Sequence, residues 1–124
     1  MHDELRNVAE KDGRFRVEAF VFVFESLHRA QELYERERHV SGRELLEGFR
    51  RLATDRYGRL AKTVLGEWGL KTTEDVGQVV FLLVSNRLMS KTDEDRVEDF
   101  AGVFDFDEVF VRDYRMGDAT QRGS

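Results

Sequence analysis

HVSGRELLEGF, residues 39–49, is the segment of this chain with the clearest local signal of structure. Ser41 can accept a hydrogen bond from the backbone amide of Glu44, and the Glu44 carboxylate can accept one from the amide of Ser41. Val40 before this cap and Leu45 after it are placed to form a hydrophobic staple. The segment therefore predicts a helix that begins at Gly42.

The residues that follow predict where this helix ends and what comes next. Gly58 is a typical stop, because glycine readily takes the left-handed conformation found after helices. A shorter helix is expected from Arg59 to Trp68, ended by Gly69, so that the two form a helical hairpin. The apolar residues expected to face inward are Leu45, Leu46, Phe49, Leu52, Ala53 and Tyr57 in the first helix and Leu60, Val64, Leu65 and Trp68 in the second.

Two helices are predicted before this hairpin. Residues 3–11 have the pattern of a short helix that ends at Asp12 and Gly13. Residues 17–34 carry apolar side chains at spacings of three and four, which predicts one long helix. Because residues 17–24 are rich in Val and Phe, a strand is the alternative for that part of the segment.

Another helix is predicted after the hairpin. Thr72 or Thr73 is expected to cap it, because Glu74 and Asp75 follow and the helix dipole favours carboxylates in a first turn. Residues 79–84 are six consecutive apolar residues. A helix that is apolar all round is expected to be buried on all sides.

The short helix expected to end at Trp68, the turn from Gly69 to Thr72, the longer helix after it and the segments that follow have the layout of a helix-turn-helix followed by a wing. Residues 88–91 and 102–106 are predicted as the short strands of a β-hairpin, with an acidic loop or short helix over residues 92–100 between them. Asp105, with Glu108 three residues later, is expected to cap a last helix.

Composition sets the class of protein. The chain has 124 residues, of which 40% are hydrophobic and 36% charged. No apolar run approaches the roughly 18 residues of a membrane span, and no segment resembles a signal peptide. With no cysteine either, the chain is expected to be cytoplasmic. The predicted fold is mainly α, a compact bundle of five to six helices in one domain over residues 1–115, with a winged-helix-like C-terminal half and a flexible polar tail over residues 116–124.

Charge is distributed unevenly. Residues 1–62 contain 13 Lys and Arg against 12 Asp and Glu, whereas residues 63–124 contain 7 against 13. Affinity for a polyanion or an anionic membrane comes mostly from basic charge, so both kinds of partner are disfavoured.

The wing-like segment is also poorly suited to DNA. Side chains that read bases and phosphates are donor-rich and basic, whereas this loop is mainly acidic, and carboxylates are repelled by phosphates. If the chain nevertheless binds nucleic acid, the candidate contacts are Lys71, Thr73, Gln78, Lys91 and Arg96.

The acidic loop and the aromatic segment 102–106 are instead the predicted contact surface for another protein. The candidate residues are Asp93, Glu94, Asp95, Glu98, Asp99 and Asp105. The leading hypothesis is a small protein-interaction or adaptor module without catalytic activity. The alternative is a winged-helix regulator that binds nucleic acid, and the third hypothesis is an unrecognised enzyme or small-ligand binder. The sequence leaves the oligomeric state open.

The acidic residues fit two other kinds of site less well. The carboxylates from residue 93 to residue 113 could bind a hard cation, but their spacing lacks the glycine and the closing glutamate of a calcium loop. Asp105, Asp107 and Glu108 could act as acid and base in catalysis, although helix capping accounts for them better.

His39 is the remaining candidate. It lies among Arg36, Arg38 and Arg43 before a helix N-terminus, where an anion could bind, although a solvated helix end is the simpler interpretation. No phosphate-binding glycine loop, nucleophile elbow or metalloprotease motif occurs. No residue is therefore assigned to a catalytic, cofactor or metal site.

Five short motifs carry a resemblance to a known family. They are HVSG at 39–42, WG at 68–69, TED at 73–75, LMSKT at 88–92 and DFDE at 105–108. Over about residues 15 to 111 the chain resembles the Planctomycetes-Verrucomicrobia conserved hypothetical proteins, some of which carry the automatic label of Fis-family transcriptional regulator.

This resemblance implies transcriptional regulation at most, and it transfers no catalytic residue. Members of that family have proline near positions 13, 16 and 59, where this chain has Gly13, Arg16 and Arg59. These departures fall at expected turns and leave the motifs intact.

Overall fold

A computed structural model of the chain describes residues 2–36, 39–90 and 97–112, and its regular elements there are all helical. The elements are α1 (His2–Asp12), α2 (Val17–Leu33), α3 (Gly42–Tyr57), η1 (Gly58–Leu60), α4 (Ala61–Glu67), α5 (Thr73–Ser85), η2 (Val97–Phe100) and η3 (Asp107–Arg112). The mainly α fold is therefore confirmed. The tail over residues 116–124 lies outside the described residues.

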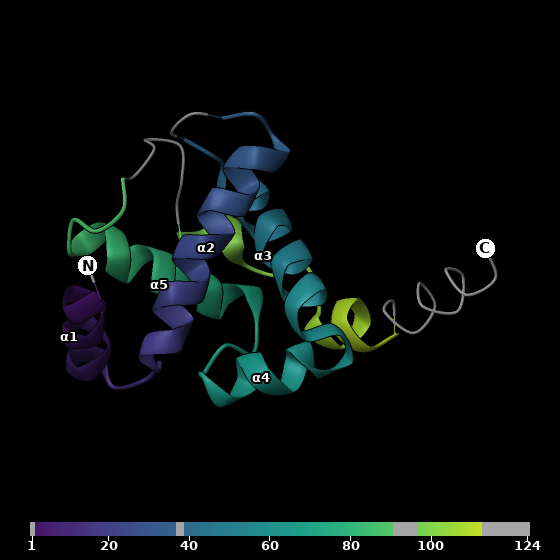
Figure 1. Cartoon of the computed structure of the whole chain (residues 1–124), viewed down its shortest axis with the longest axis horizontal. Coiled ribbons are helices and arrows are strands. Elements are labelled where there is room, and N and C mark those ends of the chain that lie inside the picture. Colours follow the sequence, from purple (N-terminus) through teal and green to yellow (C-terminus); the bar gives the residue numbers. More distant parts are fainter. Residues whose placement is uncertain (1, 37–38, 91–96, 113–124) are drawn as a thin grey trace.

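The long helices α2 and α3 form the centre of the fold. They pack along each other, α5 packs across α2, and α1 and α4 flank this group (Figure 1). Residues 17–24 are helical, so the strand alternative is wrong. Their apolar side chains recur at helical spacing, and Ala19, Phe20, Phe22 and Val23 are buried.

Gly48 sets how closely α2 and α3 approach. A Cβ atom at Gly48 would lie 2.6 Å from the carbonyl oxygen of Ser26 and 2.8 Å from the backbone nitrogen of Ala30. The Ser26 hydroxyl, which is buried, donates to the carbonyl of Phe22 within the same helix at 2.8 Å. A backbone-to-backbone contact this close needs a residue without a side chain.

The capping box at the start of α3 is confirmed. The Glu44 amide donates to Ser41 Oγ at 3.1 Å, and the Ser41 amide donates to Glu44 Oε1 at 2.8 Å. The hydrogen bond from the Ser41 amide lowers the pKa of Glu44, as does the nearby Arg36 guanidinium. Gly58 follows α3 with a positive φ of 52°, so the predicted stop is confirmed, but its ψ of -125° lies outside the left-handed helical region, so the predicted left-handed conformation is wrong.

Ser41→Ala is expected to lower the free energy of unfolding by about 1 kcal/mol, because the amide of Glu44 loses its acceptor. Urea denaturation measures this change. Ser85→Ala is the matched control, since the Ser85 hydroxyl only donates to the carbonyl of Phe81 in its own helix. Equal effects of the two substitutions would contradict the structural role of the box.

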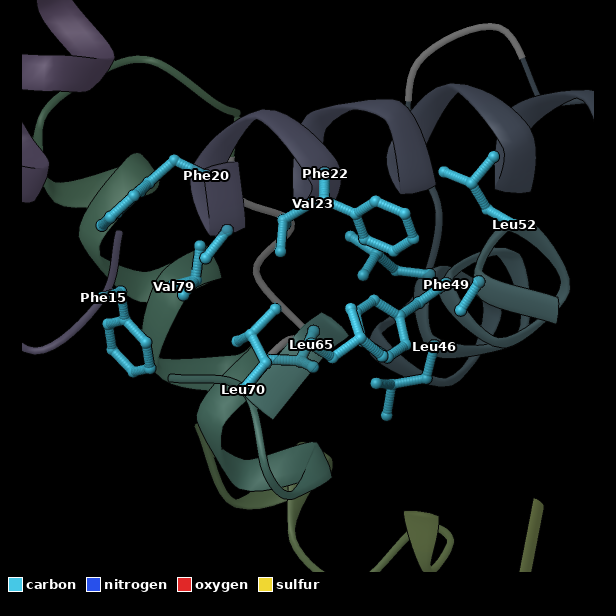
Figure 2. Packing of buried hydrophobic residues seen from close by; sticks show 14 of the residues in the cluster. Phe15, Phe20, Phe22, Val23, Leu46, Phe49, Leu52, Leu65, Leu70 and Val79 are labelled. Carbon is cyan, nitrogen blue, oxygen red and sulfur yellow. The ribbon is translucent and has the colours of Figure 1, made fainter. Parts of the chain in front are cut away.

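The core is built mainly from aromatic and aliphatic side chains of α2, α3, α4 and α5. Phe22 and Phe49 meet edge to face, with ring centroids 5.4 Å apart. Leu65 of α4 and Leu70 after it are fully buried beside them (Figure 2). This cluster holds the two long helices against the shorter elements.

Two expectations about apolar residues are wrong. Leu60, which was expected to face inward, is 65% exposed in the short 3-10 turn η1. Phe81 in the apolar run of α5 is 53% exposed. The helix α5 packs against α2 on one side and η2 on another, which buries Val76, Val79 and Leu83 but leaves Phe81 outside.

The predicted β-hairpin is not formed in the part of the chain that the structure describes. Residues 88–90 form a bend, and residues 101–105 form a turn followed by non-regular backbone. Lys91 and the rest of the loop to residue 96 lie outside the described residues. The winged-helix-like half is therefore not supported.

Phe100 and Phe106 explain why residues 102–106 do not form the predicted strand. Phe100 lies against two glycines, since a Cβ at Gly77 would be 2.7 Å from Phe100 Cβ and one at Gly42 would be 3.1 Å from the Phe100 ring. Phe106 is also buried. Burying both side chains in the core requires a backbone path that is incompatible with the predicted strand.

Asp105 caps the last element, as its sequence position predicts. Its Oδ1 accepts hydrogen bonds from the amides of Asp107 at 2.8 Å and Glu108 at 3.2 Å. The element that follows, η3, is a π-helix rather than an α-helix. Phe110 at its centre is fully buried.

Candidate functional site

A pocket of about 490 Å³ lies where α4, the start of α5 and the segment before η3 meet. Its lining residues are Lys62, Lys71, Thr72, Glu74, Gly102, Val103, Phe104, Asp105, Phe106, Asp107 and Glu108. Residues 62–74 and residues 102–108 are far apart in the sequence, so the pocket is a product of the fold.

The start of α5 forms one wall. Thr72 caps this helix together with Asp75, whose amide donates to Thr72 Oγ1 at 3.2 Å and whose carboxylate accepts from the Thr72 amide at 3.1 Å. The capping box fixes the backbone of the first turn of α5. The position from which the Glu74 side chain projects is thereby fixed as well.

Two side chains of that first turn hold the opposite wall. The hydroxyl oxygen of Thr73, which is fully buried, accepts a hydrogen bond from the Val103 amide at 3.2 Å. Glu74 Oε1 accepts one from the Gly102 amide at 3.4 Å. The backbone of residues 102–103 is thereby fastened to α5, which gives the pocket a defined width.

Aromatic rings support the base of the pocket. Phe104 stacks on Phe106 with centroids 5.8 Å apart, and Phe106 meets Phe110 edge to face at 5.1 Å. Phe49 of α3 contacts both Phe106 and Phe110. Phe104 is only half-buried, so part of its ring remains available at the pocket.

The charges around the pocket are mainly negative. Four carboxylates, from Glu74, Asp105, Asp107 and Glu108, line it against two lysines. Lys62 Nζ forms an ion pair with Asp107. Hydrogen bonding by Lys62 lowers the pKa of Asp107, so this carboxylate is ionised at neutral pH.

This arrangement narrows the chemistry that the pocket can perform. A lowered pKa makes Asp107 a poor general acid, because an acid must hold its proton near neutral pH. Across residues 2–36, 39–90 and 97–112, no three His, Asp or Glu side chains gather closely enough to hold a metal ion. The carboxylates are thus spread around the pocket rather than directed at one point.

The predicted interaction residues fall in three places. Asp105 lines the pocket, whereas Glu98 and Asp99 are exposed on η2 and are not part of the lining. Asp93, Glu94 and Asp95 lie outside the described residues.

The predicted nucleic-acid contacts do not share one surface. Lys71 is exposed at the pocket, and Gln78 is half-buried. Thr73 is fully buried and occupied by the Val103 amide, so its proposed role in contacting bases is wrong. Lys91 and Arg96 lie outside the described residues.

Sequence reasoning missed Lys62 and Glu74 as members of this site. Lys62 lies 45 residues from its partner Asp107, and no local pattern indicates such a pairing. The run DFDE at 105–108, in which acidic and aromatic residues alternate, is the one sequence signal that falls on the lining of the pocket.

The start of α3 is a weaker candidate for an anion site. Arg36 donates to Glu44 Oε2 at 3.4 Å, so the charge of this arginine is partly compensated. Glu44 in turn accepts from the amide of Ser41 at the helix N-terminus. A carboxylate of the chain therefore already lies where an external anion would bind.

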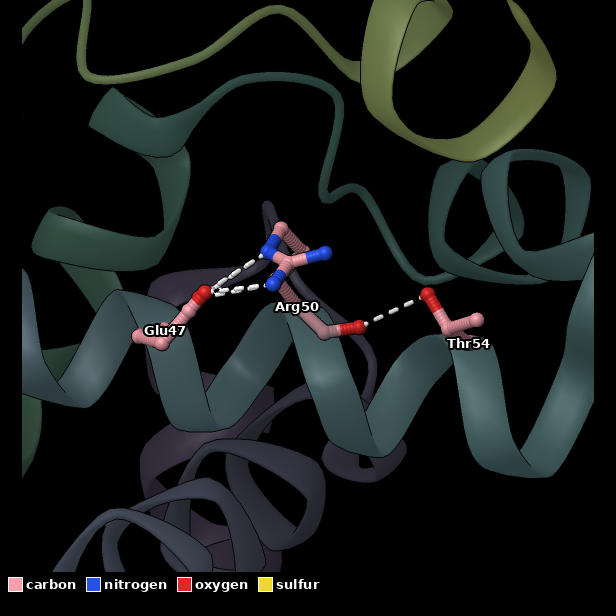
Figure 3. Close-up of polar contacts among 3 residues, drawn as sticks. All are labelled: Glu47, Arg50 and Thr54. Carbon is pink, nitrogen blue, oxygen red and sulfur yellow. Dashed lines mark hydrogen bonds and ion pairs between the residues drawn. The ribbon is translucent and has the colours of Figure 1, made fainter. Parts of the chain in front are cut away.

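Ion pairs link residues within α3 and join α3 to α2. Glu47 accepts two hydrogen bonds from Arg50 Nε and two from Nη2, between 2.6 and 3.0 Å, and the Arg50 carbonyl accepts one from Thr54 Oγ1 at 3.0 Å (Figure 3). Arg56 reaches from α3 to Glu25 on α2, with Nη1 donating to Oε1 at 3.0 Å.

Glu25→Gln and Arg56→Met are expected to show a coupling free energy of about 0.5 kcal/mol at neutral pH, because both side chains are more than one third exposed and solvent screens the pair. Hydrogen bonding by Arg56 lowers the pKa of Glu25 in the folded chain. The coupling is thus complete above the unfolded pKa of Glu25 and is lost as pH falls through its folded pKa.

A double-mutant cycle by urea denaturation, at neutral pH and at a pH well below the ordinary carboxylate range, measures this coupling. The cycle compares the effect of each single substitution with its effect when the other residue is already substituted, so the variants act as internal controls. A coupling that persists in acid would show that the ion pair is not its source.

Comparison of this chain with protein-family models, with curated proteins and with solved structures finds no match. In the described part of the chain, none of the helices combines the length and the apolar character needed to span a membrane.

Proposed function

We propose that this chain is a protein-interaction module that binds a partner protein through the pocket between α4, α5 and residues 102–108, without catalysing a reaction. The observation that carries this proposal is an open pocket of about 490 Å³ whose lining combines four carboxylates with a partly exposed aromatic ring. The pocket is more polar than a typical small-molecule site, which is lined mainly by apolar side chains, and this favours a charged group of a partner as its occupant.

Charge favours a protein partner over a nucleic acid. Phosphates are repelled by a carboxylate-lined pocket, and one of its two lysines is already paired with Asp107. The two cations and the half-buried Gln78 do not provide the basic surface that phosphate binding needs. No observation in the described residues favours the nucleic-acid regulator as a second candidate.

The rigid construction of the pocket also supports binding. Its walls are joined by the hydrogen bonds from Val103 to Thr73 and from Gly102 to Glu74, and Phe106 and Phe110 tie its base to the core. A site that is already formed loses little conformational entropy when it binds. As part of the proposal, the module acts in the cytoplasm.

Photo-crosslinking in cells tests this function. A benzoylphenylalanine at position 71, at the edge of the pocket, is expected to give a discrete adduct with another protein. The adduct is expected to disappear when Glu74→Gln and Glu108→Gln are added, since these changes remove charge but keep the shape and the oxygen acceptor.

Two controls make the outcome decisive. Glu4→Gln with Glu10→Gln removes the same charge from exposed positions of α1 and is expected to leave the adduct unchanged. Thermal unfolding of each variant checks that the fold is intact. An adduct that survives the pocket variant, or the lack of any discrete adduct from position 71, would contradict the proposed function.

A further inference from the structure

We infer that the pocket receives an arginine side chain from a basic segment of the partner protein. This inference rests on the proposed function and specifies the chemistry of the partner. The lining carries four carboxylates and two lysines; Lys62 pairs with Asp107, and Arg112 lies 4.0 Å from Glu108. Among the described residues Glu74 and Asp105 form no ion pair, and their oxygens accept hydrogen bonds from backbone amides. A cationic group complements the remaining charge.

The spread of the carboxylates favours a large cation over a metal ion. Hard metal ions need several oxygens at one point, roughly 2.0 to 2.6 Å from the ion. The described residues contain no such gathering of carboxylates. A guanidinium has five donors in a planar fork and can satisfy oxygens on separate side chains at once.

The aromatic part of the lining favours arginine over lysine. Phe104 is stacked on Phe106 and still contributes to the pocket surface. A guanidinium plane can stack on such a ring, and it is more weakly hydrated than an ammonium, so it loses less on leaving water. Arginine can therefore use the carboxylates and the ring together, whereas lysine offers a point charge.

Lys62 is expected to compete with the incoming arginine. Its ammonium occupies Asp107 in the unbound chain, and its positive charge repels a second cation in the pocket. Lys62→Met removes this competition while keeping an apolar stem of similar length. Because both partners of the ion pair are about half exposed, its loss is expected to cost the fold little.

Titration of the ¹⁵N-labelled full chain, followed by two-dimensional NMR at low ionic strength, tests the inference. The probe is an acetylated and amidated peptide in which Gly and Arg alternate, and matched peptides carry Lys or Glu in place of Arg. Saturable shifts are expected for the amides of Gly102, Val103 and Asp107 with the Arg peptide, weaker ones with Lys and none with Glu.

The variants are expected to change affinity in opposite directions. Lys62→Met is expected to strengthen binding of the Arg peptide by roughly 3-fold or more, and Glu74→Gln with Glu108→Gln to weaken it by at least as much. Phe104→Leu is expected to reduce the preference for Arg over Lys, because the stacking ring is lost while the apolar volume is largely kept. The α1 charge variant is expected to bind as the wild type does.

Three results would overturn the inference. They are equal binding of the Arg and Lys peptides, shifts that centre on exposed η2 residues rather than on the pocket, and weaker binding by Lys62→Met. If the peptide fails to bind while the crosslink from position 71 still depends on Glu74 and Glu108, the proposed function stands and the inference about arginine is wrong. If the crosslink from position 71 does not depend on Glu74 and Glu108 while the Arg peptide still binds at the pocket, the pocket binds arginine but the proposed function is wrong.

Discussion

Gly48→Ala is expected to lower the free energy of unfolding by about 1 to 3 kcal/mol, the range typical of overpacking a closely packed interior. The added methyl would lie 2.6 Å from the Ser26 carbonyl oxygen and 2.8 Å from the Ala30 nitrogen, and both of these are backbone atoms of α2. No change of side-chain rotamer can relieve such a contact. The two helices must separate, and that opens the core around them.

Gly66→Ala is the matched control for this substitution. Gly66 also lies inside a helix, α4, but nothing lies within 4 Å of the position its Cβ would take. There the gain in helix propensity is expected to raise stability by roughly 0.5 to 1 kcal/mol. Urea denaturation of both variants should give opposite signs, and a Gly48→Ala variant as stable as the wild type would refute the close approach.

Phe49→Ala is expected to lower the free energy of unfolding by about 3 to 5 kcal/mol, because a fully buried ring is replaced by a cavity. Phe49 contacts Phe22 of α2 on one side, and on the other it contacts Phe106 and Phe110, which support the pocket. The substitution therefore loosens both the core and the base of the pocket.

Phe81→Ala provides the comparison at an exposed ring. With 53% of Phe81 exposed, its removal is expected to change stability by no more than about 0.5 kcal/mol. Chemical denaturation followed by the fluorescence of Trp68, whose ring lies 5.7 Å from that of Phe22, reports on the core directly. Similar losses at positions 49 and 81 would be inconsistent with the packing described above.

The parts of the fold that could be predicted from the sequence are those that local chemistry controls. The capping pairs at Ser41 and Thr72 and the stop at Gly58 act within a few residues, and all three are present. Their signals do not depend on what the rest of the chain does.

The errors arose where distant residues determine the outcome. Alternating Phe and Asp at 104–107 has the period of a strand, but Phe106 is drawn into the core that Phe49 provides. The exposure of Phe81 depends on which faces of α5 find partners, and an unbroken apolar run cannot indicate that.

The pocket was predictable only in part, for the same reason. Asp105 was singled out because acidic residues are dense near it in the sequence. Lys62 and Glu74 belong to elements that approach residues 102–107 only after folding, since their contacts span 45 and 28 residues. No spacing rule for local motifs reaches that far.

The seating of Phe100 against Gly42 and Gly77 has an evolutionary consequence. Each glycine leaves room for the ring, so the three positions share one fixed volume. A larger residue at position 42 becomes acceptable only when the ring at position 100 shrinks; at position 77 the contact is with Phe100 Cβ, so a larger residue there needs glycine at position 100 or a shift of η2. In related sequences these three positions are therefore expected to vary together, although 58 residues separate the first from the last.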